Sequence, residues 1–248
     1  MTSRTSKHFD QLADRYSRLR ASPDPLDPVT RAVAELGDLR GRRVLDVGCG
    51  PGTILGQLMR AYGVDAVGID ASPQMIEAAR RETPETQEFH VARAEQLPFD
   101  DATFDAALAR WVVHHVDRPR AFGEILRVLR PGGRLVITTT DPDAVHTHWM
   151  TPFFPSLVSI ERGRFPSGEA LTGELESAGF DAVQVVPFVL ERRLTRDEAL
   201  EKLRGRAYST FVLMTDAEYQ QGIAAAEARL PDAIAYELNL LNVVAMRP

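Results

Sequence analysis

Cysteine is almost absent from this chain, because Cys49 is the only one among 248 residues. A single thiol excludes an intramolecular disulfide framework and is typical of a protein from a reducing compartment. Long apolar runs are missing as well, since no stretch of about 18 residues is predominantly apolar. The sequence also shows no secretory signal peptide. We therefore expect a cytoplasmic protein with no membrane partner.

Dense clusters of positive charge are also lacking. Lysine occurs only at Lys7 and Lys202, and the formal net charge is -6 at pH 7. Proteins that bind nucleic acid present Lys/Arg patches to the phosphate backbone, so this balance argues against a nucleic-acid partner. What remains is ordinary for a globular protein, with 44 % apolar and 26 % charged residues. The length suits one α/β domain with additions.

The most informative stretch is a glycine-rich loop within residues 44–52, which read VLDVGCGPG. A short apolar run contains Asp46, glycines follow at Gly48, Gly50 and Gly52, and a helical apolar pattern comes next. A strand, a tight turn and a helix in this order form the unit with which α/β proteins hold a nucleotide-like ligand. Glycine permits a close approach of backbone to ligand because it has no Cβ.

Two kinds of ligand compete for this loop. A dinucleotide site needs Gly-x-Gly-x-x-Gly with the pyrophosphate at the helix N-terminus, whereas the third glycine here comes one residue early, at Gly52. Asp46 would also repel a pyrophosphate, but it would attract an ammonium or a sulfonium. The local charge therefore favours a zwitterionic ligand with a cationic centre, and S-adenosylmethionine fits that description.

With these residues the chain resembles the class I S-adenosylmethionine-dependent methyltransferases, of the type that includes ubiquinone- and menaquinone-pathway enzymes and many small-molecule methyltransferases. The resemblance covers roughly residues 8–140 by motif and, weakly, 167–180. It implies S-adenosylmethionine as the cofactor and a Rossmann-like methyltransferase fold. It does not identify 141–166 or 191–234, which are the segments that would name the substrate.

Strand-like and helix-like patterns alternate along the chain. Such alternation predicts an α/β fold with a doubly wound, mostly parallel sheet and right-handed crossovers, and the resemblance implies seven strands. We expect helices over residues 8–20 and 29–36, helices that begin at 73, 119 and 168, two helices within 195–230, and strands over 44–47, 66–69, 88–91, 104–108, 134–139, 183–190 and 236–246.

The same patterns suggest a division into parts. We expect residues 1–40 to form an N-terminal helical cap, with a Pro-rich break at 22–25, and residues 41–248 to form the methyltransferase domain. Two inserts, 141–166 and 195–230, depart from the regular alternation. Because ligands of open α/β sheets bind beyond the carboxyl ends of the strands, we expect these inserts to form the acceptor pocket and a helical lid.

Residues downstream of the loop are expected to complete the cofactor site. Asp70 closes a strand about 20 residues further on, where an acidic side chain can accept both ribose hydroxyls of a dinucleotide or of S-adenosylmethionine. Ser72 and Pro73 already supply the cap and first residue of the next helix, which leaves Asp70 for the ligand. The resemblance implies further cofactor contacts from Tyr16, Ala71, Met75, Ala94, Glu95 and Arg110. For Tyr16 and Met75, packing in the core is an alternative explanation.

One position departs from the family pattern. Where the family commonly has Asp or Asn before the alanine of the adenine-binding segment, this chain has Arg93. A guanidinium cannot accept a hydrogen bond. Either Glu95 or a backbone carbonyl must then accept from the adenine amino group.

Histidines and aromatic residues gather where the acceptor is expected. His114 and His115 follow the fourth strand and are the candidate catalytic residues, because an imidazole can take a proton near neutral pH. The alternative is a pair of histidines at a helix end, one exposed and one packed. The candidate substrate contacts are Trp111, His148, Trp149, Phe153, Tyr208 and Phe211. The alternative is that the aromatic residues of the inserts only pack these inserts onto the core.

Some chemistries are excluded by missing partners. His146 and His148 have no acidic or cysteine partner nearby in sequence, so no metal site is expected. The chain lacks the (Asp/Asn)-Pro-Pro-aromatic motif by which adenine amino methyltransferases of nucleic acid resemble one another. Cytosine C5 chemistry needs a cysteine nucleophile, and Cys49 lies in the cofactor loop instead.

The sequence therefore predicts a methyltransferase that moves a methyl group from S-adenosylmethionine to oxygen or carbon of a small, apolar or aromatic metabolite. Such in-line displacement relies on holding the reacting atoms at attack distance in a dry site. Two alternatives stay open, a catalytically inactive S-adenosylmethionine-binding partner or regulator and a nicotinamide-dependent oxidoreductase. The oligomeric state is not determined by these patterns.

Overall fold

We describe the protein from a computed structural model, which covers residues 3–20, 26–83 and 88–248. The Pro-rich break expected at 22–25 lies outside the described residues. In the described part, seven strands form one sheet in the order β3-β2-β1-β4-β5-β7-β6. These strands are β1 (Arg43–Val47), β2 (Asp65–Asp70), β3 (Glu88–Val91), β4 (Phe104–Arg110), β5 (Leu129–Thr140), β6 (Asp181–Thr195) and β7 (Ala233–Met246).

The strand order confirms the predicted doubly wound, mostly parallel sheet. The strands from β3 to β5 pair in parallel, whereas β7 runs antiparallel to both β5 and β6. β1 lies between β2 and β4, so the order along the sheet reverses at β1 and β4. Such a switch point is where open α/β sheets bind their ligands.

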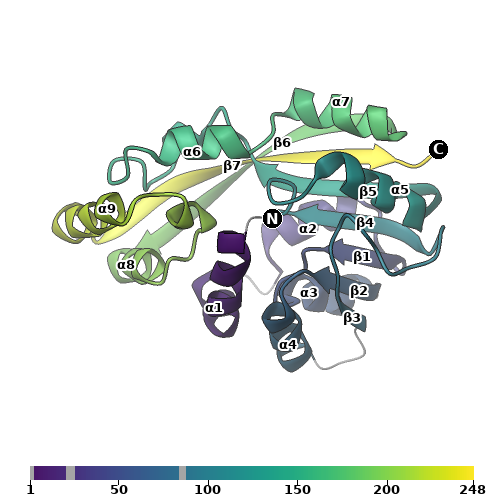
Figure 1. Ribbon diagram of the computed structural model, residues 1–248, viewed down its shortest axis with the longest axis horizontal. Coiled ribbons are helices and arrows are strands. Elements are labelled where there is room, and N and C mark those ends of the chain that lie inside the picture. The colour runs from purple at the N-terminus through teal and green to yellow at the C-terminus, as the bar shows by residue number, and fades with distance from the viewer. Residues whose placement is uncertain (1–2, 21–25, 84–87) are drawn as a thin grey trace.

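Helices cover both faces of this sheet (Figure 1). On one face Val33, Leu58 and Ile76 join a buried apolar cluster with the strands, and on the other face Ile125 and Leu171 do so. Each helix thus turns an apolar stripe toward the sheet, as an amphipathic helix must. The helices of the first face are α2 (Pro28–Leu36), α3 (Thr53–Tyr62) and α4 (Pro73–Glu82), and those of the second are α5 (Arg118–Val128) and α7 (Gly168–Ala178).

β6 and β7 continue well beyond the rest of the sheet. Residues 240–246 of β7 pair with β5, but residues 233–239 pair only with residues 189–195 of β6. The result is a two-stranded ribbon that carries α8 (Arg196–Arg204) and α9 (Asp216–Arg229) at its end (Figure 1). The predicted strand over 183–190 was too short, since β6 continues to Thr195. Residues 191–193 of this extension are Glu-Arg-Arg, and only one face of the strand is partly buried. The apolar pattern that indicates a strand is therefore weak there.

The two inserts meet and form an apolar core of their own. Phe154 from the first insert packs with Leu203 and Phe211 from the second. Gly222 allows this close packing, since a Cβ there would lie 2.2 Å from Phe154 Cε1. We call residues 141–166 and 189–239 the lid. Its helices are η1 (Val145–Thr147), α6 (Leu157–Arg164), α8 (Arg196–Arg204), η2 (Ser209–Val212) and α9 (Asp216–Arg229).

The N-terminal helix α1 (Ser3–Arg20) contacts both the sheet domain and the lid, and it begins before the predicted residue 8. On the sheet side, Ser72 Oγ donates a hydrogen bond to Asp10 Oδ1 at 2.6 Å. On the lid side, Arg18 forms an ion pair of 3.2 Å with Glu201. α1 therefore joins the two parts of the molecule at the carboxyl edge of the sheet.

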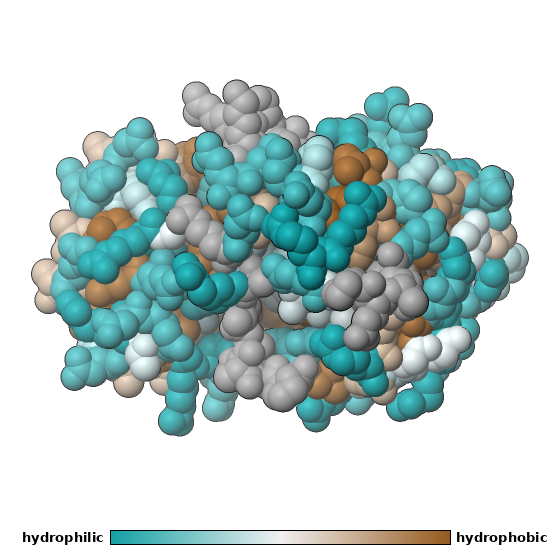
Figure 2. Space-filling view, turned by 90° about the horizontal axis from the view of Figure 1, so that it is seen from below, coloured by the Kyte–Doolittle hydropathy of each residue, from teal (hydrophilic) through white to brown (hydrophobic). Residues whose placement is uncertain are grey.

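The outer surface is mainly polar. On the face seen in Figure 2, hydrophilic residues cover most of the described surface and apolar residues show as separate patches. Scattered apolar residues of this kind are normal on protein surfaces. Among the helices of the described residues, none has the length and apolar character needed to cross a bilayer.

Candidate functional site

A cavity of about 730 Å³ lies at the carboxyl ends of β1, β2 and β4, and its walls include α1 and the lid. Small-molecule sites typically have volumes of roughly 300–1,000 Å³, so one cavity has room for a cofactor and a small acceptor. It brings together most of the predicted site residues. Those that line it are Tyr16, Asp46, Gly48, Gly50, Asp70, Ala71, Met75, Ala94, Glu95, Arg110, Trp111, His114, His115, His148 and Tyr208.

The glycine loop after β1 presents bare backbone to this cavity. Gly48 and Gly50 both line it, with φ of +76° and +53°. A Cβ on Gly50 would meet no described atom within 4 Å. On Gly48, in contrast, a Cβ would lie 2.7 Å from Val112 Cγ2. Gly50 is thus the position where a ligand can lie directly against the main chain.

Gly52 has a packing role, and its cofactor contact stays a prediction. It is the N-cap of α3 with φ of +75°, and it lies outside the described cavity lining. A Cβ there would lie 2.9 Å from Phe89 Cζ and 3.0 Å from Thr83 Oγ1. We therefore assign Gly52 to the close approach of α3 to β3 and α4. In the sequence the three glycines occupy alternate positions, so their spacing does not distinguish the packing of Gly52 from the exposure of Gly48 and Gly50 to the cavity.

Asp46 is a buried acid beneath the loop. It lies on β1, is 3 % exposed and lines the cavity. Burial raises its pKa to about 6, an effect that Asp70 reinforces and Arg110 opposes. A cationic group in the cavity would favour the carboxylate and lower this pKa again. The electrostatics therefore fit a ligand that carries an ammonium or a sulfonium, such as S-adenosylmethionine.

Asp70 connects β2 to the glycine loop. Its carboxylate accepts hydrogen bonds from Gly50 N at 3.0 Å and from Ser72 N at 2.8 Å. Burial raises the pKa of Asp70, while these two hydrogen bonds act in the opposite direction. Each carboxylate oxygen has more than one lone pair, so the side chain can also accept from ribose hydroxyls. Its place in the cavity is compatible with the predicted ribose contact.

Met75 and Tyr16 lie where both roles that the sequence left as alternatives are possible. Met75 is 2 % exposed and packs with Ala13 and Ala78, and Tyr16 lies against the same cluster. Both side chains also line the cavity. A core residue at a cavity wall can contact a ligand with its inner surface, so packing does not exclude either cofactor contact.

The segment after β3 carries the predicted adenine contacts. Ala94 and Glu95 line the cavity, and Arg93 forms an ion pair of 3.1 Å with Glu95. Glu95 Oε1 also accepts from Asp117 N at 3.0 Å, at the start of α5. Burial raises the pKa of Glu95, but the hydrogen bond from Asp117 and the charge of Arg93 outweigh it and lower the pKa overall. Glu95 is therefore an ionised side chain that already holds α5.

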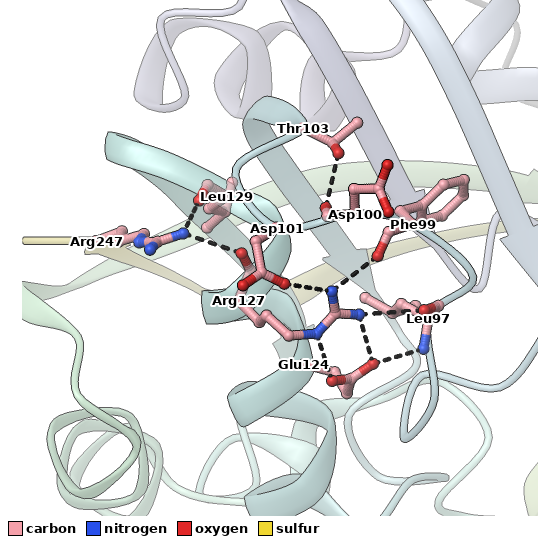
Figure 3. Close-up of polar contacts among 9 residues, drawn as sticks. All are labelled: Leu97, Phe99, Asp100, Asp101, Thr103, Glu124, Arg127, Leu129 and Arg247. Carbon is pink, nitrogen blue, oxygen red and sulfur yellow. Dashed lines mark hydrogen bonds and ion pairs between the residues drawn. The ribbon is translucent and has the colours of Figure 1, made fainter.

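An arginine network that sequence reasoning missed fixes this segment (Figure 3). Arg127 on α5 donates to Leu97 O at 3.1 Å and to Phe99 O at 2.7 Å, and it pairs with Asp101 at 2.8 Å. The Glu124 carboxylate accepts hydrogen bonds from Arg127 Nε at 2.8 Å and from Arg127 Nη2 at 2.9 Å. It also accepts one from Leu97 N at 2.8 Å. A planar guanidinium can serve several acceptors at once, so one side chain holds the whole loop.

His114 and His115 lie side by side in the cavity wall, with ring centroids 3.9 Å apart. The His114 ring also lies 4.2 Å from the Phe165 ring, and the edge of Phe9 meets His115 at 5.5 Å. Burial lowers the pKa of His115 to about 3 and the pKa of His114 well below its usual value, with a contribution from the charge of Arg164. Both imidazoles are neutral at pH 7.

The predicted substrate contacts divide into two groups. Trp111, His148 and Tyr208 line the cavity. Trp149, Phe153 and Phe211 lie outside its described lining and belong to the lid core. These three pack in the lid core, and their contact with the acceptor stays a prediction. Sequence alone does not separate His148 and Tyr208 from these three, since all five occur in the same two inserts.

Trp111 carries the clearest backbone strain in this region. Its φ is +48°, which a bulky side chain rarely adopts. Trp111 N donates to Thr138 O at 2.8 Å, which ties the end of β4 to β5. The guanidinium of Arg110 lies 5.2 Å from the Trp111 ring centroid. Strain of this kind is often found at functional sites, and here it directs an aromatic side chain to the cavity.

Further lining residues were not among the predicted substrate contacts. Tyr236 on β7 lies 5.5 Å from the His148 ring, so the two form an aromatic wall with Tyr208. Glu161 and Phe165 also reach the cavity from the first insert. Among the described residues, no group of three or more His, Cys, Asp or Glu side chains is arranged to hold a metal ion.

Comparison with known proteins identifies the family. A family model described as a methyltransferase domain matches residues 45–137. The chain is 38 % identical over 166 residues to the O-methyltransferase cnsE of Penicillium expansum, covering 64 % of this chain and 59 % of that protein. It is 35 % identical over 207 residues to the demethylmenaquinone methyltransferase of Clavibacter sepedonicus, covering 72 % of this chain and 83 % of that protein.

A solved structure supports the same fold. A putative methyltransferase from an antibiotic biosynthesis pathway of Anabaena variabilis superposes with a TM-score of 0.72 at 22 % identity, covering 86 % of this chain and 95 % of that one. The protein therefore belongs to the class I S-adenosylmethionine-dependent methyltransferases, as its loop motif indicated. S-adenosylmethionine is the cofactor of that family, and Asp46, Gly50 and Asp70 provide a site that fits it.

Proposed function

We propose that this protein transfers the methyl group of S-adenosylmethionine to oxygen or carbon of a small apolar or aromatic acceptor. The observation that carries the proposal is the single cavity, which joins the glycine loop and Asp46 on one side to the histidine pair and the lid on the other. The relatives support it, because they include an O-methyltransferase and a demethylmenaquinone methyltransferase.

The cofactor side of the cavity has a role for each residue. We assign the methionine half to Asp46, Arg110, Gly48 and the bare backbone at Gly50, with Tyr16 over it. Asp70 receives the ribose hydroxyls. The adenine lies between Ala71, Met75, Ala94 and Glu95. Because Glu95 Oε1 already accepts from Asp117 N and Arg93, we place the adenine amino group on its other oxygen or on a backbone carbonyl of this segment.

The bound cofactor supplies an electrophilic methyl group at a sulfonium centre. The protein holds the acceptor's nucleophilic atom in line with that methyl group and excludes water around it. Trp111, His148, Tyr208 and the lid supply the apolar enclosure, and His114 and His115 present neutral ring nitrogens to the acceptor.

The neutral histidines indicate which acceptors suit the site. A neutral imidazole accepts a hydrogen bond from a hydroxyl, and it can take up a proton. With a pKa of about 3, however, His115 holds a proton weakly, far from the value that suits a general base at neutral pH. We therefore expect acceptors that ionise readily, such as phenols and enols, to react much faster than alkyl alcohols.

Methyl transfer from labelled S-adenosylmethionine to a panel of phenols, quinone precursors and polyketide-like compounds tests the proposal. Product formation on at least one phenol or enol is expected. Tight binding of S-adenosylhomocysteine with no transfer to any acceptor would favour the non-catalytic alternative. Calorimetric binding of NAD(H) but not of S-adenosylhomocysteine would overturn the cofactor assignment as well.

The histidines have a test of their own. Replacement of His114 or His115 by Asn is expected to lower kcat by about 3- to 10-fold, the effect of a weakened hydrogen bond to the acceptor, while the Kd of S-adenosylhomocysteine stays unchanged. His146→Asn is the matched control, because His146 is an exposed histidine of the first insert outside the described cavity lining. Equal kcat values for all three variants would remove the histidines from the mechanism.

A further inference from the structure

A buried polar cluster lies in the part of the cavity that the lid encloses. Arg164, at the end of α6, forms an ion pair of 3.1 Å with Glu161 and donates to Ser209 Oγ at 2.8 Å and to Thr210 Oγ1 at 3.2 Å. Thr210 Oγ1 in turn donates to Glu161 Oε1. Both charged side chains are only 13 % exposed. We call these four residues the lid polar cluster.

This cluster faces the cavity, because Glu161, Ser209 and Thr210 all line it. Met150 and Leu157 are buried apolar residues of the lid in the same lining. A buried ion pair is expensive in desolvation, and apolar side chains of similar size would join α6 to η2 at least as well. The energetic cost therefore calls for a further role, which a carboxylate at the wall of a ligand cavity can fill.

The cluster lies next to the histidine pair. Phe165 follows Arg164 in sequence, and its ring lies 5.6 Å from the Arg164 guanidinium and 4.2 Å from the His114 ring. The charge of Arg164 also reaches both histidines, where it adds to the effect of burial in lowering their pKa values. Glu161, which pairs with Arg164 at 3.1 Å, thus lines the same cavity as His114 and Phe165.

We propose that Glu161 is a specificity residue, and that it accepts a hydrogen bond from a second hydroxyl or N–H group of the acceptor. This inference rests on the proposed function and deepens it. Arg164 and Thr210 fix the carboxylate that faces the cavity, and a carboxylate has about four lone-pair positions, so a ligand donor can join those already present. The acceptor class is then an aromatic or enolic compound with two polar groups, one methylated and one read by Glu161.

A site built to receive a donor discriminates against ligands that lack it. An acceptor without the second hydroxyl would displace water from the Glu161 carboxylate. It would not replace the hydrogen bond that this water had donated. The expected preference is about 10- to 100-fold in kcat/KM for a dihydroxy over a monohydroxy acceptor, the range for a hydrogen bond to a charged group.

Mono- and dihydroxynaphthalenes serve as the matched probes. In the wild type, the dihydroxy compounds are expected to show the higher kcat/KM and the lower Kd, the latter measured by calorimetry with S-adenosylhomocysteine bound. Glu161→Gln is expected to reduce the preference about tenfold, because the neutral amide oxygen accepts more weakly. The double variant Glu161→Met/Arg164→Met is expected to abolish it, and it avoids an unpaired buried charge.

Two controls separate specificity from stability. Glu174→Gln removes a partly buried ion pair of 2.5 Å with Arg118 between α5 and α7, and it is expected to leave the preference unchanged. Unfolding curves and the Kd of S-adenosylhomocysteine establish that each variant folds and keeps its cofactor site. A merely structural role for Glu161 would lower kcat/KM for both naphthalene classes equally.

The outcomes distinguish this inference from the proposed function. An unchanged preference in folded Glu161 variants overturns the inference, as does equal or absent binding of the two naphthalene classes to the wild type. If no naphthalene or other acceptor is methylated but the dihydroxy compounds bind more tightly through Glu161, the specificity residue stands and the proposed transfer fails.

Discussion

The carboxylate of Asp70 accepts a hydrogen bond from the backbone N–H of Gly50 at 3.0 Å, so the last residue of β2 holds the loop that follows β1. The same carboxylate accepts from Ser72 N at 2.8 Å, at the start of α4. One partly buried acid thus connects two loops that line the cavity. The proposed ribose contact and the shape of the loop therefore depend on the same side chain.

We predict that Asp70→Asn raises the Kd of S-adenosylhomocysteine by about 10- to 100-fold, because an amide nitrogen cannot accept from the ribose or from the loop backbone. Calorimetric titration measures this change. Asp65→Asn is the control at the opposite end of β2, where Asp65 pairs with Arg43 at 2.6 Å, and its Kd is expected to match the wild type. Equal Kd values for both variants would contradict the ribose assignment.

We predict that Asp46→Asn stabilises the cofactor-free protein at pH 8. The pKa of Asp46 is about 6 when folded, against about 3.9 for an unfolded Asp. The folded state thus holds this proton more tightly, so the associated stability is complete below about pH 4 and is lost as the pH rises through about 6. The variant should be more stable by about 1–3 kcal/mol at pH 8 and equal to the wild type near pH 4, as measured by urea unfolding.

The same substitution should weaken cofactor binding. Binding of a cationic ligand beside Asp46 requires the carboxylate, so the Kd of S-adenosylmethionine for the wild type should rise as the pH falls below about 6. Asp46→Asn should bind more weakly at pH 8 and show no such pH dependence. A wild-type Kd that is flat between pH 5 and 8 would contradict the electrostatic role of Asp46.

We predict opposite profiles for two glycine substitutions. Gly52→Ala should lower the free energy of unfolding by about 2 kcal/mol or more, because it combines a left-handed backbone with a Cβ 2.9 Å from Phe89. Gly50→Ala meets no described atom within 4 Å, so it should cost only about 1 kcal/mol while it raises the cofactor Kd. Urea unfolding and calorimetry on both variants distinguish packing from ligand contact.

We predict that Arg127→Met destabilises the protein by about 2 kcal/mol and raises the Kd of S-adenosylhomocysteine roughly tenfold. The substitution removes the hydrogen bonds that hold Leu97, Phe99 and Asp101 in Figure 3 and loosens the segment that carries Ala94. Arg130→Met is the control, since Arg130 pairs with Asp105 at 2.5 Å at a more exposed position. Destabilisation without any change in Kd would confine Arg127 to a structural role.

Much of the fold was predictable because its signals are local. Ser72 and Pro73 marked the start of α4, and Ser72 Oγ does accept from Met75 N at 3.1 Å. The strand predicted over 88–91 matches β3. The ribbon formed by β6 and β7 was not predictable, because its stability comes from pairing between segments more than 35 residues apart and from the lid core.

The sequence by itself determined the parallel sheet, the glycine loop and the acids at Asp46 and Asp70, because each depends on residue types at short spacing within one strand-loop-helix unit. Only the tertiary structure separated Gly50 from Gly52 and Tyr208 from Phe211. It also brought Glu161 and the histidines to the lining of one cavity. These roles depend on which distant surfaces meet, and the packing of the lid against the sheet edge sets that.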